Sequence, residues 1–481
     1  MAEYDLLIRG GTLIDGSGAP AKAGDLAVLD GRIARIGAAD SISPRQARRT
    51  IEADGRVVAP GFIDAHTHDD MAVLKMPDMF SKISQGVTSV VVGNCGISAA
   101  PIRLAEAPKP PLNLLGVQSD FVFERFADYV AAVEQARPAV NVAALIGHGT
   151  LRVRTMADLD RRATPSEIAE MRHLLAQSLD EGAIGFSTGL FYDINSGADA
   201  EEVAALAELA QARGIYATHL RDEFAGVADS LSEAFETSRR AQVPLVISHH
   251  KCAMPENWGR SRETLSMIAQ AAQRQPVSLD AYPYTAGSTI LDPSKLRGDV
   301  RTLVTWSTPH PEVGGRDLAE IAREWGCSTV QAAQRLLPAG AIYFQMDEAD
   351  VRAILAFPLT MIGSDGLPHD SHPHPRLWGT FPRVLGHYAR DLGLFSLEEA
   401  VNKMTGLTAS RFGLAGRGLI REAYAADLVI FDPVRIRDMA TYEVPTRPAE
   451  GIACVIVNGV VAWQPDTGQV MRAGRMLGAS L

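Results

Sequence analysis

Apolar and polar residues alternate with a period of two near both ends of the chain. Near the start the alternation covers residues 4–9, and near the end it covers residues 427–431 and 454–463. This pattern is typical of β-strands that are buried on one face. Neither end contains enough strands to be stable by itself. We therefore predict that residues 1–60 and 415–481 combine into one small β-sandwich.

Between these ends, short apolar strand-like segments alternate with amphipathic helical segments. One helix start is especially clear, because Thr164 opens a capping box ahead of Pro165 and apolar residues follow at helical spacing as far as Leu179. The strand-like segments end near His66, Cys95, His148, Ser187, His219, His249, Tyr282 and Asp365. Eight such units predict an α/β fold, a (β/α)8 TIM barrel over residues 61–414, with catalytic groups at the carboxyl ends of the strands.

The connection between the seventh and eighth predicted strands is unusually long. About eighty residues separate Tyr282 from the strand before Asp365, whereas about thirty suffice for one βα unit. An extra helical segment is predicted over residues 317–337. We expect residues 290–345 to form an inserted subdomain that folds over the barrel mouth.

The composition is that of an ordinary globular protein. Of 481 residues, 46% are hydrophobic and 21% are charged, and 46 Lys and Arg against 57 Asp and Glu give a net charge of −11. This charge disfavours a nucleic-acid partner, which needs a basic surface. No apolar run reaches the ~20 residues of a membrane helix, and the chain begins with an acidic segment rather than a basic signal-peptide head. We expect a cytoplasmic protein without a membrane partner, and the oligomeric state stays open.

Histidines at predicted strand ends suggest a metal site. His66 and His68 lie two apart on one strand, so both imidazoles face the same cavity. An isolated pair of this kind is more often two surface histidines, but His219 and His249 end the fifth and sixth predicted strands, one βα unit apart. We assign His249 as a ligand and the adjacent His250 to a packing or supporting role.

Three further strand-end residues are candidates for chemistry. Asp365 is placed to act as general acid and base beside a metal, a role worth roughly 10² to 10⁴ in rate, although it could instead cap the turn before Gly366. Cys95 could be a metal ligand, but alone it is more simply a buried thiol. His148 is a weaker candidate for a supporting or substrate-binding role.

Several motifs carry a family resemblance over essentially the whole chain. They are Pro-Gly-Phe-Ile-Asp-Ala-His-Thr-His at residues 60–68, Gly-Asn-Cys-Gly at 93–96, Ser-His-His-Lys at 248–251, Gly-Ser-Asp-Gly-Leu-Pro at 363–368 and His-Pro-Arg-Leu-Trp-Gly at 374–379. The chain resembles the amidohydrolase superfamily, and within it the N-acyl-D-amino acid deacylases, a group that includes D-aminoacylases and N-acyl-D-glutamate deacylases.

The resemblance implies a metal-ligand set and a reaction. Most of the superfamily uses a carbamylated lysine on the fourth strand, where this chain has Phe186-Ser187. The deacylase branch uses a cysteine from the second strand instead, which implies that Cys95, His219 and His249 bind Zn²⁺ tightly. His66, His68 and Asp365 then line a second site that is weak or empty. The implied reaction is hydrolysis of a linear amide, in which Asp365 takes a proton from the attacking water and later protonates the departing amine.

The resemblance also implies substrate-binding residues. Arg376 matches a residue that pairs with the α-carboxylate, and Tyr192 and Tyr282 match residues that contact the carboxylate or the scissile carbonyl. Lys251 and Lys295 would hold a second carboxylate, which favours N-acyl-D-glutamate. Glutamate-specific relatives carry arginine where Lys295 falls, and lysine lacks the planar fork of arginine, so broad or hydrophobic N-acyl-D-amino acid activity stays open.

Two other functions compete with this hypothesis. A cyclic-amide hydrolase of the dihydroorotase or hydantoinase kind would share the barrel and the first histidine pair, but its bridging lysine is absent. A binding protein with the same barrel and no catalysis is disfavoured by the retained histidine pairs and Asp365. Zinc content and hydrolysis of N-acyl-D-amino acids distinguish the three.

Overall fold

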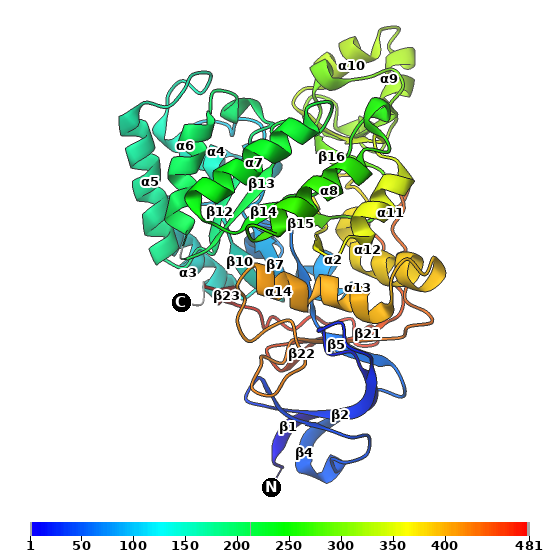
Figure 1. The fold of residues 1–481 in the computed structure, drawn as a ribbon. Coiled ribbons are helices and arrows are strands. Elements are labelled where there is room, and N and C mark those ends of the chain that lie inside the picture. Colours follow the sequence, from blue (N-terminus) through cyan, green and yellow to red (C-terminus); the bar gives the residue numbers. More distant parts are fainter. Residues whose placement is uncertain (1, 212, 479–481) are drawn as a thin grey trace.

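A computed structural model describes residues 2–211 and 213–478. Figure 1 shows three parts: a central barrel with helices around it, a β-sheet layer below it that holds strands from both ends of the chain, and a smaller projection at the upper right. The central part holds most of the candidate site residues, and the projection adds residues of the long connection to the same cavity.

Eight parallel strands form the central barrel. They are β6 (Phe62–Asp64), β7 (Val87–Val92), β10 (Asn141–Ala144) continued by β11 (Ile146–Gly147), β12 (Gly185–Gly189), β13 (Ile215–His219), β14 (Leu245–Ile247), β15 (Val277–Ala281) and β19 (Thr360–Ile362). Each pairs in parallel with the next. The ring closes between the last strand and the first, where the backbone N–H of Ala65 donates to the carbonyl of Ile362 at 3.1 Å. The predicted (β/α)8 barrel is confirmed.

Helices surround the barrel. The longer ones are α3 (Phe126–Ala136), α4 (His148–Thr155), α5 (Pro165–Asp180), α6 (Ala200–Ala207), α7 (Val227–Ala241), α8 (Ser261–Ala272), α11 (Glu348–Ala356), α12 (Arg376–Arg383) and α13 (Leu397–Met404). Helix α5 begins at the predicted capping box, since the Thr164 hydroxyl accepts from the N–H of Glu167 and the Glu167 carboxylate accepts from the N–H of Thr164. Among the described residues, no helix has both the length and the apolar character needed to cross a bilayer.

The sheet layer joins strands from both ends of the chain. Strands β1 (Tyr4–Leu13), β2 (Lys22–Leu29), β3 (Arg32–Gly37), β4 (Ala47–Glu52) and β5 (Val57–Pro60) share one sheet with β20 (Leu428–Phe431), β21 (Ile452–Val457) and β22 (Val460–Trp463). The antiparallel pairing of β5 with β20 makes the connection. Side chains from both ends, including Leu6, Val28, Leu428 and Ile456, share one buried apolar cluster.

One short strand departs from the predicted organisation. Strand β23 (Met476–Leu477) lies within the segment assigned to the sandwich, but it pairs in parallel with β10 at the bottom of the barrel. It fits there because β10 pairs with β7 on its other side. The fourth strand, β12, pairs on the side of the third strand with β11, which continues β10 higher up, and not with β10 itself. The end of the chain therefore fills the lower gap between the third and fourth strands. Residues 479–481 of the predicted segment lie outside the described residues.

The long connection forms a subdomain with its own core. Strands β16 (Gly287–Ile290), β18 (Ala339–Tyr343) and β17 (Thr302–Ser307) make a three-stranded antiparallel sheet that the sequence pattern did not reveal. The single helix predicted over residues 317–337 is two helices, α9 (Leu318–Glu324) and α10 (Thr329–Leu336), because Gly326 has a left-handed φ of 63° and Ser328 caps a new helix. In Figure 1 this subdomain projects beside the barrel.

Candidate active site

The candidate site residues sit where the barrel strands turn into loops. Three of them adopt left-handed backbone conformations: φ is 54° at Cys95, 35° at His249 and 50° at Asp365. Such conformations are uncommon for residues other than glycine and persist only where surrounding contacts hold them. At Asp365 the backbone N–H donates to the carbonyl of His66 at 2.8 Å, and at His249 it donates to the Asp280 carboxylate at 2.9 Å. These hydrogen bonds hold the uncommon backbone conformations at His249 and Asp365, and the side chains of all three residues point toward one another.

The predicted ligands form two clusters that share Cys95. One cluster contains His66, His68, Cys95 and Asp365, and the other contains Cys95, His219 and His249; within each, the ligand atoms lie within 4.8 Å of one another. The Cys95 Sγ lies 3.2 Å from Nε2 of His66 and 3.2 Å from Nε2 of His249. All of these side chains are buried. The geometry brings together the six residues proposed as metal ligands.

The chemistry of the clusters suits a transition metal. A thiol with two imidazoles is a ligand set typical of catalytic zinc, which leaves a fourth position open. Both ring nitrogens of His219 and Nδ1 of His68 are buried without a hydrogen-bond partner among the described residues. A buried polar atom without a partner is costly, so the clusters fit a bound metal ion.

The charges of the protein groups favour a cation between them. Burial opposes ionisation of the Cys95 thiol, yet the imidazoles of His66 and His249 hold its pKa well below the ordinary value. Burial likewise opposes ionisation of Asp365, but Arg376 and His249 keep the pKa of that carboxyl well below its usual range. Burial alone would lower the pKa of His68, whereas Asp365 and Cys95 raise it to about 9. The thiolate and the carboxylate are thus ionised, and a metal ion would displace protons from the imidazoles.

Ser187 lies on the fourth barrel strand, β12, and contacts the turn that contains Cys95. Its hydroxyl accepts a hydrogen bond from the N–H of Gly96 at 3.0 Å and donates one to the carbonyl of Gly93. These two hydrogen bonds hold the turn before and after Cys95 and so fix its conformation. Gly96 has a φ of 74°, and a Cβ there would lie 2.5 Å from the backbone nitrogen of Gly189, so this turn needs glycine.

Two carboxylates that no sequence motif marks contact the histidines. Asp280 on β15 lies 3.3 Å from Nδ1 of His66 and also accepts from the N–H of His249. Glu223 lies 3.1 Å from Nδ1 of His249 and 3.4 Å from Nε2 of His219. The only sequence signal for Glu223 was its position four residues after His219, just past a strand end. Asp280 directly precedes the end of a strand and gave no signal of its own.

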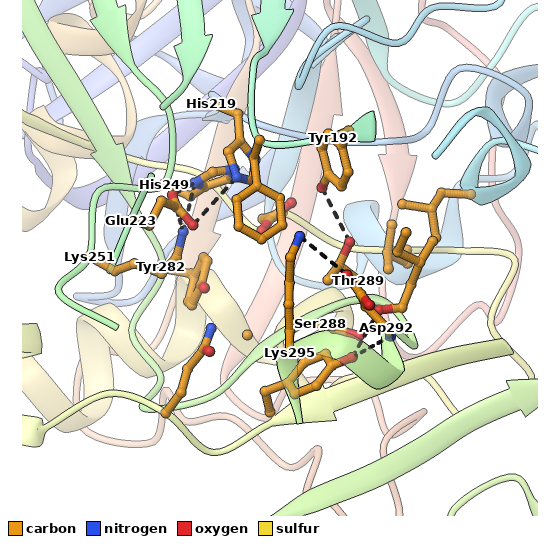
Figure 2. Close-up of a pocket in the computed structure, with 18 of the residues that line it drawn as sticks. Tyr192, His219, Glu223, His249, Lys251, Tyr282, Ser288, Thr289, Asp292 and Lys295 are labelled. Carbon is orange, nitrogen blue, oxygen red and sulfur yellow. Dashed lines mark hydrogen bonds and ion pairs between the residues drawn. The ribbon is translucent and has the colours of Figure 1, made fainter. Parts of the chain in front are cut away.

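Four of the five predicted substrate residues surround a cavity above the clusters. Figure 2 shows Tyr192, Lys251, Tyr282 and Lys295 around this cavity, and His68 and Asp365 also line it. The Tyr192 hydroxyl lies 3.2 Å from the Thr289 hydroxyl, and Tyr282 has a buried hydroxyl without a hydrogen-bond partner among the described residues. A free buried hydroxyl facing a cavity is suited to a polar group of a ligand.

The cationic side chains differ in how freely they face the cavity. Nζ of Lys295 lies 3.3 Å from Asp292 and 3.4 Å from the centre of the Phe191 ring, and its side chain is 30% exposed. Nζ of Lys251 instead donates to Oε1 of Glu223 at 2.6 Å and lies 2.8 Å from Nδ1 of His249. The structure therefore leaves Lys295 the more accessible cation.

Arg376 lies behind the cavity rather than among its lining residues. It is fully buried, stacks 4.5 Å from the centre of the Tyr282 ring, and donates to the carbonyl of Ser288 at 2.9 Å. Its Nη1 lies 2.9 Å from Asp365. Its role as the partner of an α-carboxylate stays a prediction, and in this structure its charge is compensated by Asp365.

Two other histidines lie outside the cavity. Nε2 of His148 lies 2.8 Å from Glu202, which also pairs with Arg152, and His148 is not among the residues that line the cavity. Its suggested supporting or substrate-binding role stays a prediction. His148 begins helix α4 instead of ending a strand. Nε2 of His250 contacts the Thr264 hydroxyl at 2.9 Å, which is a packing role behind the ligands.

Comparison with known proteins gives full-length matches. The sequence profile of the amidohydrolase family matches residues 49–289 and 297–462. Three relatives from Alcaligenes xylosoxydans xylosoxydans are similar over nearly all of both chains. They are a D-aminoacylase (55% identical, covering 98% of this chain and 97% of the relative), an N-acyl-D-aspartate deacylase (48%, 99% and 95%) and an N-acyl-D-glutamate deacylase (48%, 99% and 96%).

Solved structures give the same result. A D-aminoacylase with a binuclear metal centre is 54% identical and superposes with a TM-score of 0.95, covering 99% of this chain and all of its own. An N-acyl-D-glutamate deacylase from Bordetella bronchiseptica, complexed with zinc and a phosphonate that mimics the tetrahedral intermediate, is 47% identical with a TM-score of 0.96 and the same coverage.

Proposed function

Because this chain belongs to the amidohydrolase family, we propose that it catalyses the metal-dependent hydrolysis of the amide bond in N-acyl-D-amino acids. The products are a carboxylate and a free D-amino acid. One observation carries the proposal: two ligand clusters sharing Cys95 meet Asp365 at the floor of a cavity, in a chain that is 55% identical over its length to a D-aminoacylase. The reaction acts on linear amides and needs no covalent intermediate with the protein.

We assign the metal as zinc. Cys95, His219 and His249 would hold it tightly, and His66, His68 and Asp365, with Cys95 shared, would form a second and weaker site. The N-acyl-D-glutamate deacylase relative contains zinc, and the D-aminoacylase relative has a binuclear centre, which supports both parts of this assignment. When bound, such a cation lowers the pKa of water and polarises a carbonyl group.

Asp365 moves the proton. Its Oδ1 lies 3.2 Å from His68 and its Oδ2 lies 2.9 Å from Arg376, so the carboxylate is held from both sides and faces the cavity. One carboxylate oxygen accepts the proton of the attacking water and later returns it to the nitrogen of the departing amine. Burial and the contacts with His68 and Arg376 fix its orientation between these steps.

The side chains that line the cavity, together with Arg376 behind it, select the substrate. Tyr192, Tyr282 and Arg376 would bind the α-carboxylate and the scissile carbonyl, and Lys251 and Lys295 would attract a side-chain carboxylate. The exposed ammonium of Lys295 favours acidic substrates such as N-acyl-D-glutamate. The Phe191 ring beneath it, and Leu114, Phe224 and Met254 nearby in the cavity lining, favour the second candidate, a deacylase of broad or hydrophobic specificity.

A substrate panel with a metal assay tests the function. The purified protein is offered the N-acetyl derivatives of D-glutamate, D-aspartate and D-leucine, their L forms, and a hydantoin, and its metal content is measured by mass spectrometry. We expect bound zinc and hydrolysis of D forms only. Ring opening of the hydantoin without hydrolysis of the linear amides would replace this function with that of a cyclic-amide hydrolase, and a folded protein without metal would refute it.

A further inference from the structure

We propose that Glu223 is a positioning residue that keeps His249 in the tautomer able to bind the metal, by preventing Lys251 from donating a hydrogen bond to the same imidazole. This inference rests on the metal centre of the proposed function. It concerns the protein's own hydrogen bonds around that centre, and none of the motifs in the sequence pointed to it.

The two nitrogens of His249 face different surroundings. Nε2 lies 3.2 Å from the Cys95 Sγ and so points into the ligand cluster. Nδ1 points the other way, toward Oε1 of Glu223 at 3.1 Å and Nζ of Lys251 at 2.8 Å. A neutral imidazole has one N–H and one lone pair. To bind a metal through Nε2, His249 must therefore carry its proton on Nδ1.

Lys251 favours the opposite tautomer of His249. An ammonium group only donates hydrogen bonds, so a lysine 2.8 Å from Nδ1 stabilises a lone pair at Nδ1. The imidazole proton would then reside on Nε2, which would block the metal-binding nitrogen. If Nδ1 carries the proton, Nζ and Nδ1 are both donors and lie only 2.8 Å apart. Such a contact is repulsive unless a nearby acceptor directs the hydrogens of both groups toward itself.

Glu223 is that acceptor. The same Oε1 that faces Nδ1 lies 2.6 Å from Nζ of Lys251, so one carboxylate oxygen receives both donors and compensates the lysine charge. The other oxygen lies 3.4 Å from Nε2 of His219, the second imidazole of the cluster. Figure 2 shows Glu223 between the two histidines and the lysine.

Burial and a backbone hydrogen bond keep Glu223 in this position. Glu223 is 6% exposed and Lys251 is 6% exposed, so water does not readily replace either partner. The backbone carbonyl of Glu223 accepts from the N–H of Ala253 at 3.2 Å, which ties the loop after β13 to the loop after β14. The acceptor, the lysine and the imidazole therefore keep one arrangement.

Metal affinity in a double-mutant cycle tests the inference. Glu223→Ala, Lys251→Met and the double variant are compared with the unaltered protein by competition with a zinc chelator. Loss of an outer partner of a metal-binding histidine typically weakens the metal affinity 10- to 100-fold, and we expect a loss of that order in Glu223→Ala. Lys251→Met should retain the affinity, and the double variant should regain most of the loss. An equal loss in the single and double variants would overturn the competition.

A second measurement reads the tautomer directly. In the metal-free protein labelled with ¹⁵N-histidine, with His249 assigned through its own substitution, we expect the Nδ1–H form in the unaltered protein and the Nε2–H form in Glu223→Ala. The Nδ1–H form in both would overturn the inference. If the alanine variant does not fold, Glu223→Leu, which fills more of the space and also lacks an acceptor, is used alone and combined with Lys251→Met with the same criteria. Neither measurement uses substrate, so a metal-binding protein that hydrolyses no N-acyl-D-amino acid would refute the proposed function alone.

Discussion

The floor and one wall of the cavity are built in different ways. The metal floor, defined as His66, His68, Cys95, His219, His249 and Asp365, comes from the ends of five barrel strands, and its members are at most 7% exposed. The insertion wall, defined as Ser288, Thr289, Asp292, Lys295 and Tyr343, comes from the long connection after β15, and Lys295 and Asp292 have side chains 30% and 25% exposed. Rigid strand ends suit the reaction itself, whereas a connecting segment can vary to suit the substrate.

This difference predicts that changes in the floor affect turnover, metal content or stability, and that changes in the wall affect discrimination between substrates. Single substitutions in the floor and in the wall therefore distinguish the two roles.

The largest effect is expected for Asp365→Asn. The amide cannot accept a proton from water, so turnover should fall by roughly 10² to 10⁴, the usual contribution of a general acid and base. Cys95, His219 and His249 remain, so the zinc in the tight site should persist. Steady-state kinetics together with metal analysis measures both quantities. Near-normal turnover would remove Asp365 from its assigned role.

The next effect is expected beneath the floor, at Lys82. This fully buried ammonium lies 2.8 Å from the Asp64 carboxylate and 2.8 Å from the Ser364 hydroxyl, and so joins the strand before His66 to the turn before Asp365. Breaking a buried ion pair typically costs about 3–5 kcal/mol, and we expect a loss of that order in the free energy of unfolding of Lys82→Met, measured with denaturant.

An ion pair on the surface supplies the control for that experiment. Arg103 pairs with Glu124 at 2.6 Å, with side chains that are 58% and 61% exposed, and exposed pairs contribute about 1 kcal/mol or less. Arg103→Met should therefore leave stability nearly unchanged. If both substitutions had the same small effect, the floor would not depend on the buried pair.

A smaller effect on one substrate class is expected for Lys295→Ala in the wall. A hydrogen bond to a charged group contributes about 1.5–3 kcal/mol, and partial exposure places this one near the lower end. The KM for N-acetyl-D-glutamate should rise about tenfold, while the KM for N-acetyl-D-leucine should change little and metal content should stay constant. Equal changes for both substrates would exclude recognition of the side-chain carboxylate by Lys295.

The same division explains how much the sequence could predict. The barrel and the histidine positions follow from local patterns, since strand ends and the spacing of His66 and His68 are visible along the chain. Cys95 looked like an ordinary buried thiol until the family resemblance assigned it. Glu223, Asp280 and Ser187 act on ligands from other strands, so only the folded barrel brings them together. The three strands of the insertion were missed because each is short and pairs with a distant partner.

The smallest and most selective effect is expected for Asp292→Asn. Asp292 is the charged partner of Lys295, and its Oδ1 also accepts from the N–H and the hydroxyl of Ser294. Asparagine keeps an oxygen for Ser294 but removes the negative charge, so Lys295 should attract an acidic side chain more strongly. A partly exposed ion pair is worth about 0.2–1 kcal/mol, which corresponds to a gain of roughly 1.4- to 5-fold in kcat/KM for N-acetyl-D-glutamate relative to N-acetyl-D-leucine. In the Lys295→Ala background the same substitution should give no such gain. A gain that persists there would mean that Asp292 acts on the substrate directly and that the wall discriminates through both residues independently.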